Sequence, residues 1–228
     1  MVSMFRDRAD AGRLLAMRLK EYSNQPDLLV LGLPRGGVPV AFEVARALKA
    51  PLDTFLVRKL GVPGHEELAM GAIASGGARV LNDMVVSGLN FDNEAIDRVT
   101  ELELKELQRR ERRYRGDKPG PDVHNRTVIL IDDGLATGTT MRAAAIALRQ
   151  QQPAKIIVAV PVAASETCDE FRNLVDEVIC AVTPRELYAV GLWYGDFSQT
   201  SDDEVYELLE RSRKEKEGMI ITGSRSAV

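Results

Sequence analysis

The apolar run from Thr127 to Ile131 most constrains what this chain can fold into. It stops at two adjacent carboxylates, Asp132 and Asp133, and a turn rich in Gly and Thr follows before a helical pattern begins. A continuous run of β-branched and aliphatic residues of this length is typical of a strand buried on both faces of a parallel sheet. The two carboxylates would then lie at the carboxyl end of the strand, where open α/β sheets bind their ligands.

The turn that follows the acids, Gly134 to Thr140, carries the residue types that hold phosphate. Backbone N–H groups and small hydroxyls at a helix N-terminus form an anion-binding site. Two acids beside such a turn predict a ligand with a phosphate at one end and sugar hydroxyls next to it. The alternative is an ordinary strand–turn–helix in which Thr caps the helix and the acids are solvated at the strand end.

The rest of the chain repeats this strand–turn–helix unit, which predicts a single α/β domain over residues 1–228 with a parallel, doubly wound sheet. The expected strands are 28–33, 52–57, 127–131, 155–160 and 178–182, and the expected helices are 10–22, 38–49, 93–115, 167–174 and 202–216. Dense glycine in 60–81 predicts a mobile loop with a short hairpin at Gly76–Gly77. Residues 218–228 are expected to be a frayed tail.

Composition excludes several classes of protein. The chain has 228 residues, of which 45% are hydrophobic and 28% charged, enough for one sizeable core. A net charge of −4 argues against nucleic acid as a partner, and no apolar run is long enough to predict a membrane span or a signal peptide. Cys168 and Cys180 show no CxxC spacing, so the prediction is two buried free thiols and a cytoplasmic location.

A second glycine-containing turn, Arg35-Gly36-Gly37, follows the first expected strand as the Gly/Thr turn follows its own. Adjacent glycines let the backbone approach a ligand closely, and arginine is a planar donor suited to phosphate oxygens. A further cationic pair, Arg58-Lys59, is expected at the end of the next strand, although basic residues at strand ends are often only solvated.

The segment from Asp132 to Thr140 resembles the phosphoribosyl pyrophosphate (PRPP) signature of type I phosphoribosyltransferases. The wider similarity is to a bacterial group of predicted phosphoribosyltransferases, and it runs from Phe5-Arg-Asp-Arg to Gly191-Leu-Trp-Tyr-Gly-Asp-Phe-Ser-Gln199. This resemblance implies a central parallel sheet flanked by helices, a flexible loop and a small hood at about residues 184–200. It also implies transfer of 5-phosphoribosyl from PRPP to a small heterocyclic base with release of pyrophosphate.

The resemblance assigns roles to particular residues. Asp132 and Asp133 would hold the ribose hydroxyls and help to place Mg²⁺, with water between metal and carboxylate. The implied 5′-phosphate site is Gly134, Leu135, Ala136, Thr137, Gly138, Thr139 and Thr140. The implied pyrophosphate site is Arg35, Gly36, Gly37, Arg58 and Lys59, with Arg35 and Lys59 as the catalytic cations. Trp193 and Tyr194 in the hood would bind the base, although an aromatic cluster can also simply pack the hood or a dimer contact.

Departures from the family pattern leave the base unassigned. Ala136 stands where enzymes for 6-oxopurines carry an acid, while Gly134 and Thr139 also differ from the usual residues. Two other functions stay open: a PRPP-binding regulator without transferase activity, and a hydrolase of sugar pyrophosphates. The basic stretch Arg109–Arg115 could serve a regulator, but a solvated helix face is the preferred interpretation. Dimers are usual in the family, so a homodimer is expected by analogy.

Overall fold

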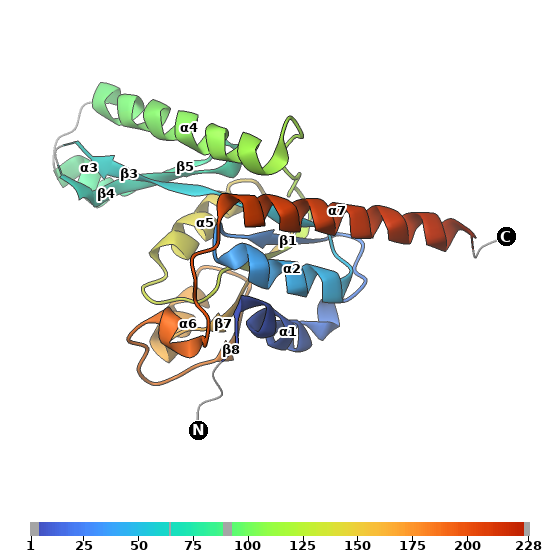
Figure 1. Ribbon diagram of the computed structural model, residues 1–228. Coiled ribbons are helices and arrows are strands. Elements are labelled where there is room, and N and C mark those ends of the chain that lie inside the picture. The colour runs from blue at the N-terminus through green and yellow to red at the C-terminus, as the bar shows by residue number, and fades with distance from the viewer. Residues whose placement is uncertain (1–4, 64, 89–92, 226–228) are drawn as a thin grey trace.

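The structure is a computed structural model that describes residues 5–63, 65–88 and 93–225, and its centre is a five-stranded parallel sheet (Figure 1). The strand order is β2-β1-β6-β7-β8, and all pairs are parallel. The strands are β1 (Leu28–Gly32), β2 (Leu52–Thr54), β6 (Thr127–Ile131), β7 (Lys155–Val162) and β8 (Glu177–Val182). The α/β class and the central parallel sheet are therefore confirmed.

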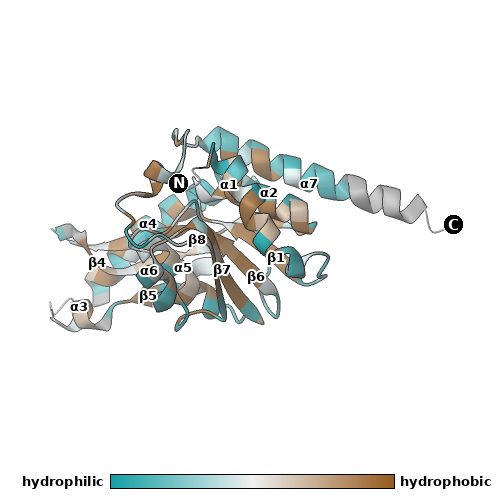
Figure 2. Cartoon of the chain, turned by 90° about the horizontal axis from the view of Figure 1, so that it is seen from below, coloured by the Kyte–Doolittle hydropathy of each residue, from teal (hydrophilic) through white to brown (hydrophobic). Residues whose placement is uncertain are grey.

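Helices cover both faces of this sheet. On one face lie α1 (Arg8–Arg18), α2 (Gly37–Leu48) and α7 (Asp202–Arg225), and on the other lie α5 (Thr139–Arg149) and α6 (Ser165–Phe171). All five residues of β6 are buried, and alternate side chains enter the two cores, Ile129 with the first group of helices and Val128 with the second. Because both faces are covered, the central strands are mostly hydrophobic, as the brown sheet in Figure 2 shows.

The register of the sheet places two turns beside each other. Gly32, the last residue of β1, pairs with Ile131, the last residue of β6, and the Leu33 amide donates to the Ile131 carbonyl at 2.8 Å. The turn before α2 and the acids after β6 therefore emerge at the same edge of the sheet. This is the edge at which open α/β sheets bind ligands.

The segment predicted as a mobile loop is instead mostly strand. An antiparallel sheet of β3 (Val57–Val62), β4 (His65–Ala74) and β5 (Arg79–Leu81) extends to one side of the molecule, with α4 (Asn93–Arg115) packed along it (Figure 1). The predicted turn at Gly76–Gly77 is present, in the short 3₁₀ segment η2 (Ser75–Gly77). The mobility of segment 60–81 stays a prediction.

This sheet also corrects the position of Arg58 and Lys59. The expected strand 52–57 is two strands, since β2 ends at Thr54 and β3 begins at Val57 in the other sheet. Arg58 and Lys59 therefore lie within β3 and not at the end of a central strand. The sequence misled because the apolar residues at 55 and 56, between the two strands, continue the pattern without a turn residue.

Two further helices complete the description. The helix α3 (Asp83–Gly88) follows β5, and α4 has the bounds that the sequence predicts. The closing helix α7 is longer than expected, because it continues to Arg225, so a frayed tail from 218 is wrong as far as the described residues reach; residues 226–228 lie outside them. None of the helices in the described ranges combines the length and apolar character that a membrane crossing requires.

Cys168 and Cys180 are joined by a disulfide, so the prediction of free thiols is wrong. Cys168 lies on α6 and Cys180 on β8, and both belong to the core between the sheet and the helices α5 and α6. The chain turns back between them, which brings together two residues 12 positions apart. The inference from free thiols to a cytoplasmic location therefore loses its basis.

Candidate active site

The two acids lie at the carboxyl end of β6, half-buried and side by side. The Asp133 amide donates to Oδ1 of Asp132 at 2.9 Å. Burial, followed by the charge of Asp133, raises the pKa of Asp132 well above its ordinary value. Burial also raises the pKa of Asp133, against the hydrogen bond and charge of Arg8. A pair of carboxylates kept at such a cost in solvation is typical of a functional site.

The turn before α2 packs directly on these acids. A Cβ added at Gly36 would lie 2.0 Å from Oδ2 of Asp133, and one at Gly37 would lie 2.6 Å from the Ile131 carbonyl oxygen. The peptide between Pro34 and Arg35 is cis. The structure thus brings together the two turns that the sequence singles out, with the Asp133 carboxylate against Gly36 and the end of β6 against Gly37.

The Gly/Thr turn has the geometry of an anion site. Gly138 adopts a left-handed conformation with φ of 67°, and α5 begins at the next residue. The first amides of a helix have no partner within it, so the amides of Thr139 and Thr140 are available to a ligand. The hydroxyls of Thr137 and Thr139 are exposed and lie 3.2 Å apart.

Other residues of this turn anchor it to the protein. Leu135 is buried, and its amide donates to the Val162 carbonyl at 2.9 Å. Behind the turn, a Cβ at Gly138 would lie 2.6 Å from the Phe171 ring of α6, and the Thr167 hydroxyl donates to the Ala136 carbonyl. Leu135 therefore fixes the turn and does not offer its side chain to a ligand.

Arg8 is a site residue that the sequence analysis missed. Its Nε donates to Oδ2 of Asp133 at 2.9 Å, and its guanidinium lies 4.0 Å from the centre of the Phe197 ring. The partner acid is 125 positions away, so no local motif could reveal the pair. Its sequence signal was its place in Phe5-Arg-Asp-Arg, where the family resemblance begins, and that motif does not indicate the partner.

The aromatic residues of the predicted base site pack against one another. Phe5 and Tyr194 form a parallel bridge, and the Tyr194 ring lies between the rings of Phe5 and Phe197, with centroids 5.3 and 5.0 Å away. Tyr194 is buried, and its hydroxyl donates to the Asp133 carbonyl at 2.5 Å. Trp193 is half-buried in the same small cluster. In this conformation Tyr194 cannot offer a ring face to a base, so its observed role is to support the acids.

The three predicted cations, Arg35, Arg58 and Lys59, lie in different surroundings. Arg35 is half-buried in the turn before α2; burial and Asp202 raise the pKa of Tyr114 at the end of α4, and the charge of Arg35 opposes that rise. Arg58 is paired with Glu103 of α4 at 2.6 Å, and Lys59 is exposed on β3. Arg58 is therefore engaged in holding the antiparallel sheet to α4, and the pyrophosphate role of these cations stays a prediction.

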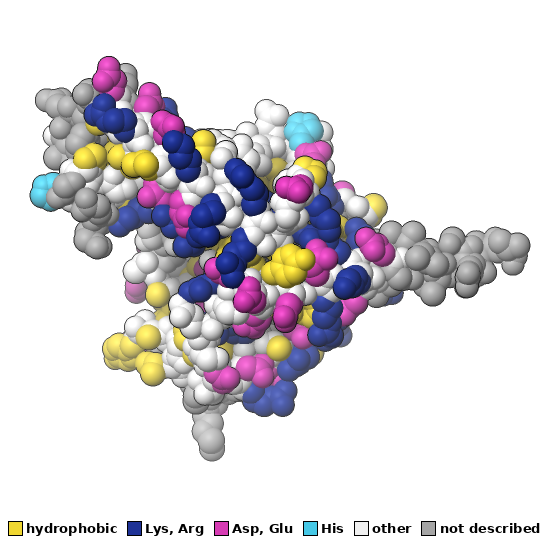
Figure 3. All heavy atoms as spheres, turned by 45° about the horizontal axis from the view of Figure 1, so that its top comes forward, with side chains coloured by type: hydrophobic (Ala, Val, Ile, Leu, Met, Phe, Trp, Pro, Cys, Tyr) yellow, Lys and Arg dark blue, Asp and Glu magenta, His cyan; other side chains and the backbone are white. Residues whose placement is uncertain are grey.

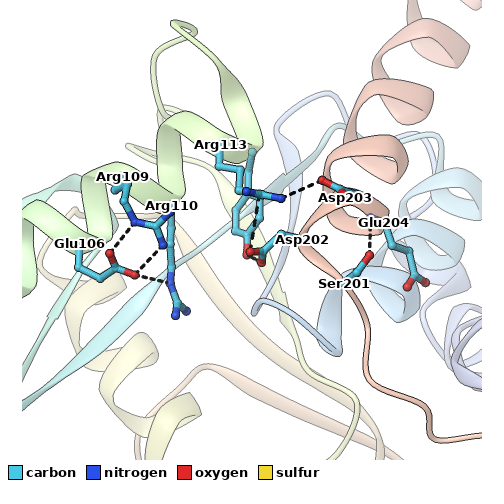
Figure 4. A network of polar contacts seen from close by, with 9 residues as sticks. Glu106, Arg109, Arg110, Arg113, Ser201, Asp202, Asp203 and Glu204 are labelled. Carbon is cyan, nitrogen blue, oxygen red and sulfur yellow. Dashed lines mark hydrogen bonds and ion pairs between the residues drawn. The ribbon is translucent and has the colours of Figure 1, made fainter.

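The basic stretch at the end of α4 is largely an ion-pair network, not a basic patch. Figure 4 shows Arg109 and Arg110 on Glu106, and Arg113 on Asp202 and Asp203 of α7. On the face that carries α4 and α7, cationic and acidic side chains are interspersed (Figure 3). This agrees with a solvated helix face for most of the stretch.

Arg115 departs from that interpretation, because it is buried. Its side chain is 3% exposed and contacts Asp53, Glu111 and the Thr54 carbonyl. Tyr114 beside it is also buried and donates to Asp202 at 2.6 Å. The last turn of α4 is thus a structural joint between the two sheets and α7.

The acids fit Mg²⁺ only in the manner that the family resemblance implies. Within the ranges that the structure describes, no three or more His, Cys, Asp and Glu residues gather as a metal cage. Two neighbouring carboxylates beside the Gly36–Gly37 turn supply the hard oxygen ligands that Mg²⁺ prefers, and the cation would keep most of its waters there. Asp132 and Asp133 are the residues that would hold it.

Paired acids, the Gly36–Gly37 turn and the N-terminus of α5 thus lie together at one edge of a parallel sheet, which defines an α/β protein with a candidate anion-binding site. Comparison with known proteins specifies it further: the phosphoribosyl transferase domain matches residues 4–191, and the chain belongs to that family.

Two Mycobacterium tuberculosis relatives, Rv0571c of strain H37Rv and MT0597 of strain CDC 1551, carry the name phosphoribosyl transferase. Each is 48% identical over 214 residues, which is 94% of this chain. The chain spans about half the length of these curated relatives, 48% in each case. Among solved structures, TT1426 from Thermus thermophilus is 41% identical with a TM-score of 0.79, covering 90% of this chain and 97% of its own.

Proposed function

We propose that this protein transfers the 5-phosphoribosyl group of PRPP, as its Mg²⁺ complex, to a ring nitrogen of a small heterocyclic base. The observation that carries the proposal is the contact between the two turns, with Gly36 against Asp133 at the carboxyl ends of β1 and β6. A ligand lying across this edge would meet acids, free amides and exposed hydroxyls in the order that a phosphorylated pentose requires.

Each part of the site has a role in this proposal. The amides and hydroxyls of Thr137 to Thr140 bind the 5′-phosphate, and Asp132 and Asp133 accept hydrogen bonds from the ribose hydroxyls. The Gly36–Gly37 turn lets the pyrophosphate approach the backbone closely, and Arg35 and Lys59 bind its charge; the Gly37 amide itself donates to the Leu33 carbonyl at 3.0 Å. When bound, Mg²⁺ would neutralise charge on the pyrophosphate oxygens.

In the reaction, the bond between ribose C1 and the pyrophosphate oxygen breaks, the bond from C1 to the base nitrogen forms, and a proton leaves the base. Positive charge on the sugar ring at the transition state is stabilised by the nearby carboxylates, and the leaving charge by Arg35 and Lys59. Ala136 supplies no acid or base, so the proton passes to solvent or to pyrophosphate. The base would enter beside the hood, near the half-buried Trp193.

The test is the double substitution Asp132→Asn with Asp133→Asn. The variant should lose PRPP–Mg²⁺ binding in calorimetry, because amides cannot supply the charge that the ligand requires, while its circular dichroism stays that of the wild type. PRPP affinity equal to that of the wild type would count decisively against the proposed site.

Turnover distinguishes the proposal from its alternatives. Wild-type protein should release pyrophosphate from PRPP only when one of a panel of purine and pyrimidine bases is present. Pyrophosphate release at the same rate without base would indicate a hydrolase, and PRPP binding without turnover on any base would indicate a regulator. On the family resemblance alone, we place this activity in the cytoplasm and expect a homodimer.

A further inference from the structure

Arg8 connects three parts of the molecule at the proposed site. It is the first residue of α1, its Nε donates to Asp133 after β6, and its Nη1 donates to the Ser198 carbonyl of the hood at 2.7 Å. The guanidinium also lies over the ring of Phe197. Only 12% of the Arg8 side chain and 16% of the Asp133 side chain are exposed.

The contact leaves Asp133 with one oxygen for a ligand. Arg8 bonds to Oδ2, the oxygen that faces Gly36, and a Cβ at Gly36 would lie 3.1 Å from Nε of Arg8 as well. Oδ2 is therefore enclosed between the guanidinium and the glycine turn. A carboxylate held by a charge-assisted bond on one oxygen has a fixed plane, which determines where its other oxygen points.

The hood is attached to the same end of the chain. The Phe5 amide donates to the Trp193 carbonyl, and the amides of Gly195 and Asp196 donate to the carbonyls of Phe5 and Arg6, all at 2.8 Å. Arg8 thus continues a backbone pairing between residues 5–6 and 193–196 into the site itself. A change in Arg8 reaches both the acid and the hood.

We infer that Arg8 is a positioning residue of the proposed site: its guanidinium fixes the Asp133 carboxylate against the glycine turn so that the free oxygen faces the ribose hydroxyls. This rests on the proposed function, and it adds a requirement that the PRPP signature itself does not contain. Arg8 acts through Asp133, so its effect should fall on sugar recognition and leave phosphate binding at Thr137–Thr140 unchanged.

The neighbouring Arg6 offers a matched control. It belongs to the same segment and also pairs with an aspartate, Asp10, at 3.0 Å, but its side chain is 75% exposed. Exposed pairs of this kind contribute little to stability. Arg6→Gln removes one positive charge two residues away and leaves the contacts of Asp132 and Asp133 unchanged.

The experiment compares ribose 5-phosphate and inorganic phosphate as calorimetric ligands for wild type, Arg8→Gln, Arg8→Lys and Arg6→Gln. Arg8→Gln should weaken ribose 5-phosphate binding about tenfold or more, as expected for loss of a charge-assisted hydrogen bond, and change phosphate binding less than about twofold. Arg8→Lys should recover part of the loss, because it restores the charge but not the planar fork. Arg6→Gln should match the wild type.

A double-substitution cycle with Asp133→Asn tests whether Arg8 acts through that acid. In the Asp133→Asn background, Arg8→Gln should weaken ribose 5-phosphate binding no further. Equal affinity of Arg8→Gln and wild type for ribose 5-phosphate overturns the inference while leaving the proposed function standing. So does parallel loss of both ligands or of the folded state, which would mark Arg8 as merely structural. Wild-type protein that binds neither PRPP nor ribose 5-phosphate would refute the proposed function itself.

Discussion

Gly36 leaves room for one carboxylate oxygen and nothing more. Its backbone has φ of −61° and ψ of −31°, values that any residue adopts, so the requirement for glycine here is one of space. A methyl group would have to displace Asp133, which Arg8 holds from the other side. At Gly36, the close packing of the two turns therefore also fixes the orientation of the Asp133 carboxylate.

Gly36→Ala should therefore weaken PRPP binding by about tenfold or more and cost about 1–3 kcal/mol of folding stability, the usual range for overpacking. Calorimetry with PRPP–Mg²⁺ and urea unfolding measure the two effects. Gly88→Ala is the matched control, because no atom lies within 4 Å of a Cβ added there. If the Gly36→Ala variant binds PRPP as the wild type does, Asp133 can move without consequence.

At the scale of elements, the last turn of α4 joins the antiparallel sheet to the main body. Arg115 reaches from α4 to Asp53 and the Thr54 carbonyl of β2, while Tyr114 reaches to Asp202 at the start of α7. Because Arg115 is buried, its removal leaves the charges of Asp53 and Glu111 without this cationic partner in a poorly solvated position, although Asp53 still accepts from the Thr54 amide.

Arg115→Ala should lower the free energy of unfolding by about 3 kcal/mol, the lower end of the range for breaking a buried pair, because both acids retain some exposure. Arg109→Ala, on the same helix but 60% exposed, should change it by less than about 0.5 kcal/mol. Urea unfolding followed by circular dichroism compares them. Equal effects would restore the view that the whole basic stretch is a solvated face.

The elements that the sequence predicted well are those set by local pattern. The β6 run is short, β-branched and without a charged residue, which favours a doubly buried strand, and α4 has long helical periodicity between clear breaks. Segment 60–81, which belongs to the antiparallel sheet, was mistaken for a loop because its glycines mark turns and also close contacts inside strands, such as Gly71 against the Val80 carbonyl. The local sequence pattern does not show which backbone of a neighbouring strand lies against a glycine.

In the site too, features set by local sequence could be predicted, and features set by distant contacts could not. The acids, the Gly36–Gly37 turn and the Gly/Thr turn could be predicted, because each follows a strand and parallel strands end at one edge. Arg8, the burial of Tyr194 and the disulfide could not, since each depends on which residues distant along the chain share a face. An aromatic cluster in a sequence does not reveal whether its ring faces are open or occupied.

At the scale of the whole molecule, the buried pair Asp132 and Asp133 lowers the free energy of unfolding, and the proposed function would explain why the pair is present. Several exposed or partly exposed carboxylates have a lowered pKa; Glu106, for example, is lowered to about 2 by Arg109. Those groups stabilise the fold at neutral pH. Asp132 is opposite in sign, because burial and the charge of Asp133 raise its pKa; between the unfolded pKa and the raised folded pKa, the folded state binds the proton more tightly than the unfolded chain does.

Asp132→Asn should therefore stabilise the protein at neutral pH. The contribution of Asp132 to stability is fully present below its unfolded pKa of about 4 and is lost as pH rises through the raised folded value, whereas Asn does not titrate. The difference in unfolding free energy between variant and wild type should be small near pH 4 and grow in favour of the variant toward pH 8. Urea unfolding at both pH values measures it, with Asp97→Asn, an exposed acid on α4, as control. A constant difference across this range would mean that Asp132 carries its charge in the fold without penalty, and the site would then lack the strain expected of a ligand-binding pair of acids.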